Sequence, residues 1–473
     1  MIKLQKPRIS DAPHIDISQS GHSRPVILKR LWGYCIIMLS LTSLYVCPAQ
    51  SEQMQLTLNQ ALNKAITYNN DLKKASYTVT SSGISVNQAK SAFLPYVNAG
   101  AGWTGSLSGR QPVRSGSTSD INVSAGLTVF DGFSRTALLQ NARSSYMANM
   151  STMESQRQLV LYTVFSYYVQ AALDSEVVRI QTENLNSQNK QLEQIEAYYK
   201  SGQKSLGDVL TQKATTAKAE LSLVNAKLDY NVAKLTLVKY IGEDSLQNNI
   251  DVIITPFDTT HILLNVSQDT SITLSIDRRK DIEAQRHEIE AAEASIKSAK
   301  SSYWPTVALS AGASSSYSPY SPNSAVTQLS DKNLNASLGI SLSVPIFDKF
   351  SAKYNVASAK VTRSREEDNL RELKRQVIYE IRDALLNYHA AEEQVRVTQT
   401  EVESAKQALD AVSARYEVGA ATLTDLTISR SDYLTSLNDR AQAISTLALK
   451  TVAVGYYCGA IPEIIAYYDG TVK

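Results

Sequence analysis

The chain has 473 residues, a formal net charge of +2 and 43% hydrophobic residues. So small a charge gives no electrostatic reason to expect nucleic acid as a partner, or strong attraction to anionic membranes. Of the three Cys, only Cys458 lies beyond the N-terminal leader, which excludes an intrachain disulfide in the mature chain.

Residues 1–49 are predicted to be a signal peptide with a long n-region. A basic pair precedes an apolar run at residues 31–46, and small residues at 47–49 suit cleavage. A retained membrane anchor is the alternative, although the run is short for a spanning helix. Lipidation of Cys47 is a second alternative, which the Val before it fits poorly.

The next part of the chain, residues 50–242, is predicted to form a first structural repeat. Apolar residues recur at helical spacing over 56–92, and the segments that follow alternate apolar and small polar residues, as strands do. Neither Gly nor Pro occurs from 134 to 201, which favours one unbroken helix. After the first helix, the expected elements are a β-hairpin at 95–131, a long helix at 134–201 and a helix at 205–241.

A second repeat is predicted at residues 276–460, after a linker at 243–275 and before a tail at 461–473. Phe-Asp-Gly-Phe-Ser, which begins at Phe130, matches Phe-Asp-Lys-Phe-Ser, which begins at Phe347, an offset of 217 residues. Similarity at a fixed offset indicates two copies of one structural unit. After a first helix, the expected elements are a β-hairpin at 305–348, a long helix at 351–418 and a helix at 422–457.

The four predicted strands suit a membrane barrel. Strands of about ten residues, with one apolar face and one small, polar face, place lipid outside and water inside. The smallest membrane barrels need about eight strands, so identical chains must share one barrel, and twelve strands from three chains is an economical answer. Soluble hairpins packed on a helix are the alternative. An aromatic belt at the membrane interface is predicted from Phe93, Tyr96, Phe130, Phe133, Tyr303, Trp304, Phe347 and Phe350.

The two long helices each extend over about 100 Å and carry apolar residues at coiled-coil spacing. In the second, Val402, Ala405, Leu409, Val412 and Tyr416 step by three and four. Helices that are apolar at their contacts and polar elsewhere form a wall that encloses water. The predicted fold class is therefore membrane α/β: an internally duplicated α-helical coiled-coil barrel, or tunnel, with four strands per chain in a shared transmembrane β-barrel. A long closed coiled coil is the alternative, but it leaves the hairpins unexplained.

Each long helix ends in the same kind of turn. The Gly suits a left-handed C-terminal residue, and a hydroxyl three residues before an acid resembles a capping box, which by itself can explain both acids. In an oligomer, the same acids would ring a pore mouth beside exposed Leu residues that offer a docking surface. The paired positions are Gly202 and Gly419, Ser205 and Thr422, Leu206 and Leu423, and Asp208 and Asp425.

Over about residues 56–460 the chain resembles the outer membrane efflux protein family, the TolC-like channels. The order of the repeats carries the resemblance, with the Phe-Asp-Gly-Phe and Phe-Asp-Lys-Phe elements and the Tyr-x-x-Gly turns. Arg279-Lys280-Asp281-Ile282 stands where the family often has Arg-Pro-Asp-Leu. The resemblance implies an outer membrane homotrimer with a shared barrel of twelve strands and a periplasmic helical tunnel. It also implies a periplasmic adaptor and an inner-membrane pump or ABC exporter as partners.

The resemblance also implies roles for residues of the turns. The Gly, Ser/Thr and Leu positions look like the tip that contacts the adaptor. Asp208 and Tyr416 match a pair that bonds across neighbouring helices to hold the tunnel shut, and Asp425 matches a narrowing ring of acids. Ala421 replaces an Arg of the family's best-known gate, and Ile428 replaces a second acid. We therefore expect a closed state that is weaker or differently locked.

The predicted function is the exit duct of a tripartite efflux or type I secretion system. A secreted coiled-coil fibre or adhesin is the alternative. An enzyme is not expected, because His261, His287 and His389 lie in no motif with an acid or a nucleophile at useful spacing. No cofactor or metal site is predicted, and the sequence does not identify the exported cargo.

Overall fold

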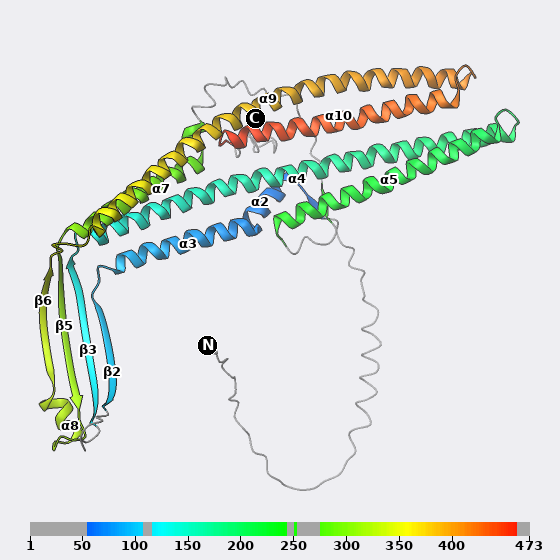
Figure 1. Ribbon diagram of the computed structural model, residues 1–473. Helices are drawn as coiled ribbons and strands as arrows, with labels where there is room; N and C mark the ends of the chain where they lie inside the picture. Colours follow the sequence, from blue (N-terminus) through cyan, green and yellow to red (C-terminus); the bar gives the residue numbers. More distant parts are fainter. Residues whose placement is uncertain (1–53, 107–115, 244–249, 253–274, 461–473) are drawn as a thin grey trace, which may run out of the picture. The chain divides into compact units, whose positions relative to one another are not determined.

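The computed structural model describes residues 54–106, 116–243, 250–252 and 275–460 (Figure 1). The predicted signal peptide, most of the predicted linker and the predicted tail lie outside these ranges. No described helix combines the length and the apolar composition that crossing a lipid bilayer demands.

The first half of the described chain contains one short strand, two shorter helices, two long strands and two long helices. The sequence predicted one helix over 56–92, but the structure has two, because Asn69 caps a new helix there. Its side chain accepts hydrogen bonds from Asp71 N and Leu72 N, and donates one to Tyr240 O. The elements are β1 (Met54–Leu56), α2 (Leu58–Tyr68), α3 (Asn70–Ser91), β2 (Tyr96–Ser106), β3 (Gly116–Phe130), α4 (Ser134–Lys200) and α5 (Leu206–Ile241).

The second half has the same order of elements, with α9 matching α4 in length at 67 residues each. A short strand that pairs with β1 precedes it, and two short helical turns lie between its long strands. The elements are β4 (Ile250–Val252), α7 (Lys280–Lys300), η3 (Ser301–Tyr303), β5 (Thr306–Tyr317), α8 (Ala325–Thr327), η4 (Gln328–Lys332), β6 (Asn335–Ser343), α9 (Ser351–Glu417) and α10 (Leu423–Tyr457).

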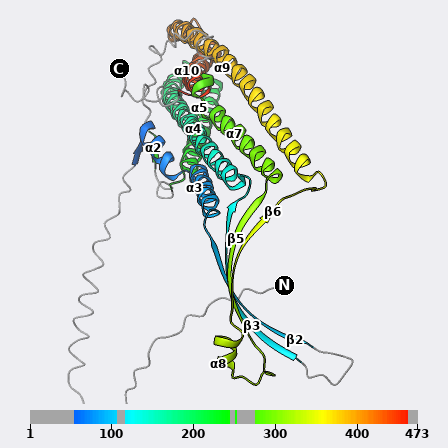
Figure 2. The same cartoon turned by 90° about the vertical axis from the view of Figure 1, so that its left-hand side faces the viewer.

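The four long strands form one antiparallel sheet in the order β2-β3-β5-β6. The pairing of β3 with β5 joins the two halves, for example at Val123 and Ala313. The sheet twists along its length (Figure 2), as L-amino acid strands do. Side chains such as Trp103, Leu338 and Ile340 are exposed in the single chain, so the sheet presents apolar groups that no part of the described chain covers.

The long helices pack as two pairs, α4 with α5 and α9 with α10, and α4 also packs on α10 (Figure 1). The main core lies around the middle of α4, where Val164, Phe165 and Tyr168 are fully buried against α2, α5 and Val452 of α10. Burying side chains of this size stabilises the fold by about 1.5–3 kcal/mol each. This core therefore holds α2, α4, α5 and α10 together around the middle of α4.

Candidate channel mouth

The two turns that follow α4 and α9 lie at the opposite ends of these helices from the strands (Figure 1). Gly202 and Gly419 have φ angles of +79° and +78°. A Cβ built at either Gly would meet nothing within 4 Å, so Gly is needed there for its backbone conformation and not for space. In each turn a backbone hydrogen bond of 2.8 Å closes the helix end, Gln203 N to Tyr198 O and Ala420 N to Arg415 O.

Both acids of the turns lie in capping boxes. Asp208 Oδ2 accepts hydrogen bonds from Ser205 N at 3.1 Å and Ser205 Oγ at 2.9 Å, and Asp208 N donates to Ser205 Oγ. Thr422 and Asp425 make the same three contacts. The hydrogen bonds from Thr422, first from its backbone, lower the pKa of Asp425, and Arg415 adds to the effect. Asp425 therefore carries a negative charge at the exposed tip at neutral pH.

The structure does not join Asp208 to Tyr416 within one chain. Tyr416 is 7% exposed, and its hydroxyl has no hydrogen-bond partner among the residues that the structure describes. The Nζ atom of Lys204 lies 4.5 Å from the centroid of the Tyr416 ring instead. Lys204 was not among the predicted site residues, because nothing in the sequence indicates that the first turn lies close to the end of α9.

The other predicted tip positions are accessible. Leu206 and Ile428 are exposed, and Leu423 and Ala421 are half-buried. Apolar side chains at a helix end, beside two Gly turns, form a surface that another protein is able to contact.

The predicted aromatic belt lies where strands meet helices. Seven of the eight rings are exposed in the single chain, and Phe130 is half-buried. Phe130 and Phe133 pack edge to face, as do Phe347 and Phe350. Arg135, which was not predicted as part of this belt, donates from Nε to Asp131 Oδ2 at 2.9 Å and lies over the Phe93 ring.

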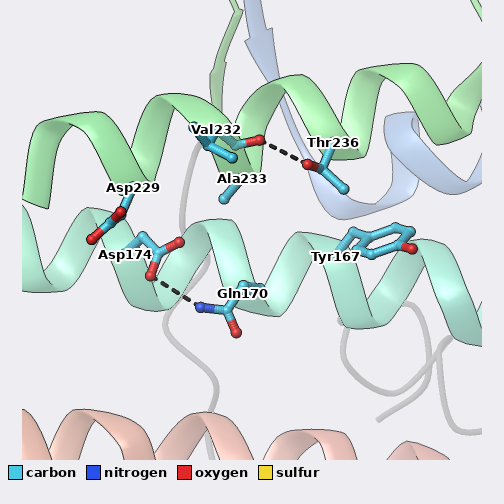
Figure 3. A pocket seen from close by; sticks show the side chains of 7 residues that line it. All are labelled: Tyr167, Gln170, Asp174, Asp229, Val232, Ala233 and Thr236. Carbon is cyan, nitrogen blue, oxygen red and sulfur yellow. Dashed lines mark hydrogen bonds between the residues drawn. The ribbon is translucent and has the colours of Figure 1, made fainter.

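An open hollow of about 450 Å³ lies between α4 and α5 (Figure 3). Burial raises the pKa of Asp174 in its wall; Gln170 donates a hydrogen bond to this carboxylate and opposes the shift, whereas the charge of Asp229 adds to it. The described residues include no group of three or more side chains suited to holding a metal ion. The hollow also contains Tyr167 and aliphatic groups, and was not expected from the sequence.

Comparison with known proteins identifies the family. The family model described as "Outer membrane efflux protein" matches residues 61–243 and 272–454, which is most of the chain and both of its halves. Among curated proteins, the chain is 26% identical over 404 residues to the outer membrane efflux protein BepC of Brucella suis, covering 84% of this chain and 83% of that protein. It is 24% identical over 381 residues to the outer membrane protein TolC of Escherichia coli K12, covering 78% and 75%.

Solved structures of such channels share the fold. The outer membrane protein VceC of Vibrio cholerae has a TM-score of 0.70 at 20% identity, covering 85% of this chain and 96% of that one. The outer-membrane channel OprN has a TM-score of 0.72 at 18% identity, covering 85% and 90%. The predicted resemblance and fold class are confirmed, and the alternative of a secreted fibre is set aside. The chain belongs to the outer membrane efflux protein family: it is an outer membrane export channel and not an enzyme.

Proposed function

We propose that three copies of the chain form the exit duct of a tripartite efflux or type I secretion system. Each copy contributes its two repeats, 50–242 and 276–460, to one tunnel and four strands to one shared barrel. The tunnel extends through the periplasm, and its mouth is formed by the turns. One observation supports this proposal above all. Helix α4 packs on α10 within one chain, whereas the equivalent surfaces of α9 and α5 are exposed.

The sheet supports a barrel that several chains share. Among the described strands, β2 and β6 each have one neighbour, so each has a free edge. In lipid, unpaired backbone groups cost several kcal/mol each, and only a closed ring of strands removes them. Pairing β6 of one copy with β2 of the next closes such a ring.

The helices support the same arrangement through the repeat. Within one chain, α4 packs on α10. The offset of 217 residues makes α9 the equivalent of α4, and α5 the equivalent of α10. The equivalent contact therefore joins α9 of one copy to α5 of the next, and it continues around a closed ring.

The exposed faces of α9 and α5 fit this contact. Ile180 of α4 is 2% exposed, whereas its equivalent on α9, Val397, is 49% exposed. Ser445 of α10 is buried, whereas its equivalent on α5, Leu228, is 60% exposed. Apolar side chains on long helices are normally covered, and a second copy supplies a helix to cover them.

Charges in the same place are complementary. A groove between α4 and α10 is lined by Glu176 and Arg179 on one side, and by Leu437 and Ile444 on the other. The equivalent groove between two copies is lined by Glu393 and Arg396 of α9, and by Glu220 and Lys227 of α5. Two acids and two bases in one groove allow every charge an opposite partner.

Reversing one charge in this groove is expected to weaken the trimer. Glu220→Arg places like charges together, which costs on the order of several kcal/mol at an interface, and Arg396→Glu does the same from the other side. The double variant restores opposite charges and is expected to recover the trimer. Dissociation temperature in detergent measures the effect; a double variant weaker than either single one contradicts the assigned contact.

The mouth is proposed as the docking site of the adaptor. Exposed Leu206, half-buried Leu423 and the Gly turns supply a partly apolar surface, and an inner-membrane pump or ABC exporter delivers the cargo. The names of relatives include a pyoverdine export protein and a cation efflux system protein, so the family serves different cargoes. We therefore propose that the pump, and not this duct, selects the cargo.

Asp208→Ala is expected to raise the conductance of the isolated channel if the carboxylate helps to close the mouth. The same change also removes a cap, so Ser205→Ala is the matched control, because it weakens the capping box and keeps the acid. Single-channel recording in planar lipid bilayers compares the two. Equal conductance in both variants leaves Asp208 with the capping role alone.

A further inference from the structure

Lys204 joins the two turns of one chain. It lies between Gly202 and Ser205 in the turn after α4, and its Nζ atom lies 4.5 Å from the ring centroid of Tyr416 at the end of α9. An ammonium at this distance from a phenol ring is attracted to the ring itself and not to its hydroxyl. The Tyr416 hydroxyl is buried without a hydrogen-bond partner in the described part of the chain, so the ring makes the contact.

We propose that Lys204 is a positioning residue of the gate, which holds the two turns of each chain together and so limits how readily the mouth opens. The proposal rests on the proposed function and names a residue that sets its regulation. The main buried core lies around the middle of α4, so a contact between the turns acts on the mouth in addition to that core.

The contact exists within one chain, and the repeat predicts no counterpart of it between neighbouring chains. The equivalent of Lys204 is Ala421, and the equivalent of Tyr416 is Tyr199. In the trimer, the equivalent contact between neighbours places Ala421 near Tyr199, with no cation. Tyr199 is 44% exposed in the single chain, in contrast to the buried Tyr416. The cation–π contact therefore acts within each chain and not between neighbouring chains, and the mouth opens when the two turns of a chain separate.

A hydrogen bond from Tyr416 to Asp208 would be a different lock at the same place, and two variants distinguish them. Asp208 Oδ2 already accepts two hydrogen bonds from Ser205. Tyr416→Phe removes the hydroxyl and keeps the ring, whereas Tyr416→Leu removes the ring. The cation–π contact predicts that only the Leu variant opens the mouth.

The test is single-channel recording on purified trimers, each first checked for its oligomeric state. Lys204→Met is expected to raise the open probability by roughly five- to thirtyfold, and Lys204→Arg to leave it unchanged, because Arg keeps the cation. Lys200→Met is the matched control, because it removes one charge from the exposed end of α4 in the same turn region. The double variant Lys204→Met with Tyr416→Leu should open no further than either single one.

A variant that adds a contact distinguishes the loss of a specific contact from general misfolding. Ala421→Lys places a cation near Tyr199 of the neighbouring chain, and is expected to lower the open probability. Trimers that conduct, but in which Lys204→Met equals Lys200→Met or Tyr416→Phe equals Tyr416→Leu, overturn the role of Lys204 and leave the duct intact. A wild-type protein that forms no conducting trimer overturns the proposed function and this role with it.

Discussion

Replacing Leu228 by Asp is expected to abolish the trimer. Leu228 is 60% exposed on α5, and its repeat-equivalent, Ser445, is buried between α4 and α10. In the proposed assembly, α9 of the next copy covers Leu228. Losing a buried Leu costs about 1.5–3 kcal/mol, burying an unpaired carboxylate costs more, and three such contacts close one ring.

Native mass spectrometry in detergent measures this result, with Val326→Asp as the matched control. Val326 is exposed in α8, which lies between β5 and β6 in the sequence. No contact between copies is proposed there. Val397→Asp on α9 approaches the same contact from the other side and is expected to act like Leu228→Asp. Trimers that persist in both variants would show that α5 and α9 do not meet.

Replacing Ile340 by Arg in β6 is expected to prevent insertion into the outer membrane. Ile340 is 76% exposed and lies on the apolar face of the sheet. An Arg facing lipid near the middle of a membrane barrel costs about 2–4 kcal/mol, and the shared barrel carries it three times.

Ser341→Arg is the control, since the next residue of a strand points to the opposite face. That face is proposed to line the water-filled bore, so this variant should insert normally. The amount of folded protein in the outer membrane fraction distinguishes the two. Equal insertion of both variants would mean that the sheet does not separate lipid from water.

The architecture was predictable because its sequence signals are long and repeated. The absence of Gly and Pro over 351–418 predicts the long α9 helix, and strict alternation of apolar residues predicts the strands. The same patterns occur in both repeats, so each prediction had support from two segments of the sequence. The break at Asn69 was missed, because Asn fits within an apolar helical pattern until its side chain is seen to cap the following helix.

The mouth was predictable only in part. The capping boxes of both turns are local, so the spacing of hydroxyl and acid in the sequence is sufficient to suggest them. Tertiary packing brings other side chains together, and these contacts were not predictable. They are the contact of Lys204 with Tyr416, and the contacts of Arg135 with Asp131 and Phe93. Moreover, Lys204 lies in the first turn, whereas the family resemblance suggested a cation of the gate only in the second turn, at the position of Ala421.

The mass and the conductance of the wild-type protein extracted from outer membranes test the central claim most directly. The mass of the particles is measured in detergent, and the same sample is then reconstituted into a planar lipid bilayer. Particles that contain three chains and that carry ion current across the bilayer are the predicted result. A mature chain recovered as a water-soluble monomer, with no current after reconstitution, would contradict a duct whose wall is shared among identical subunits.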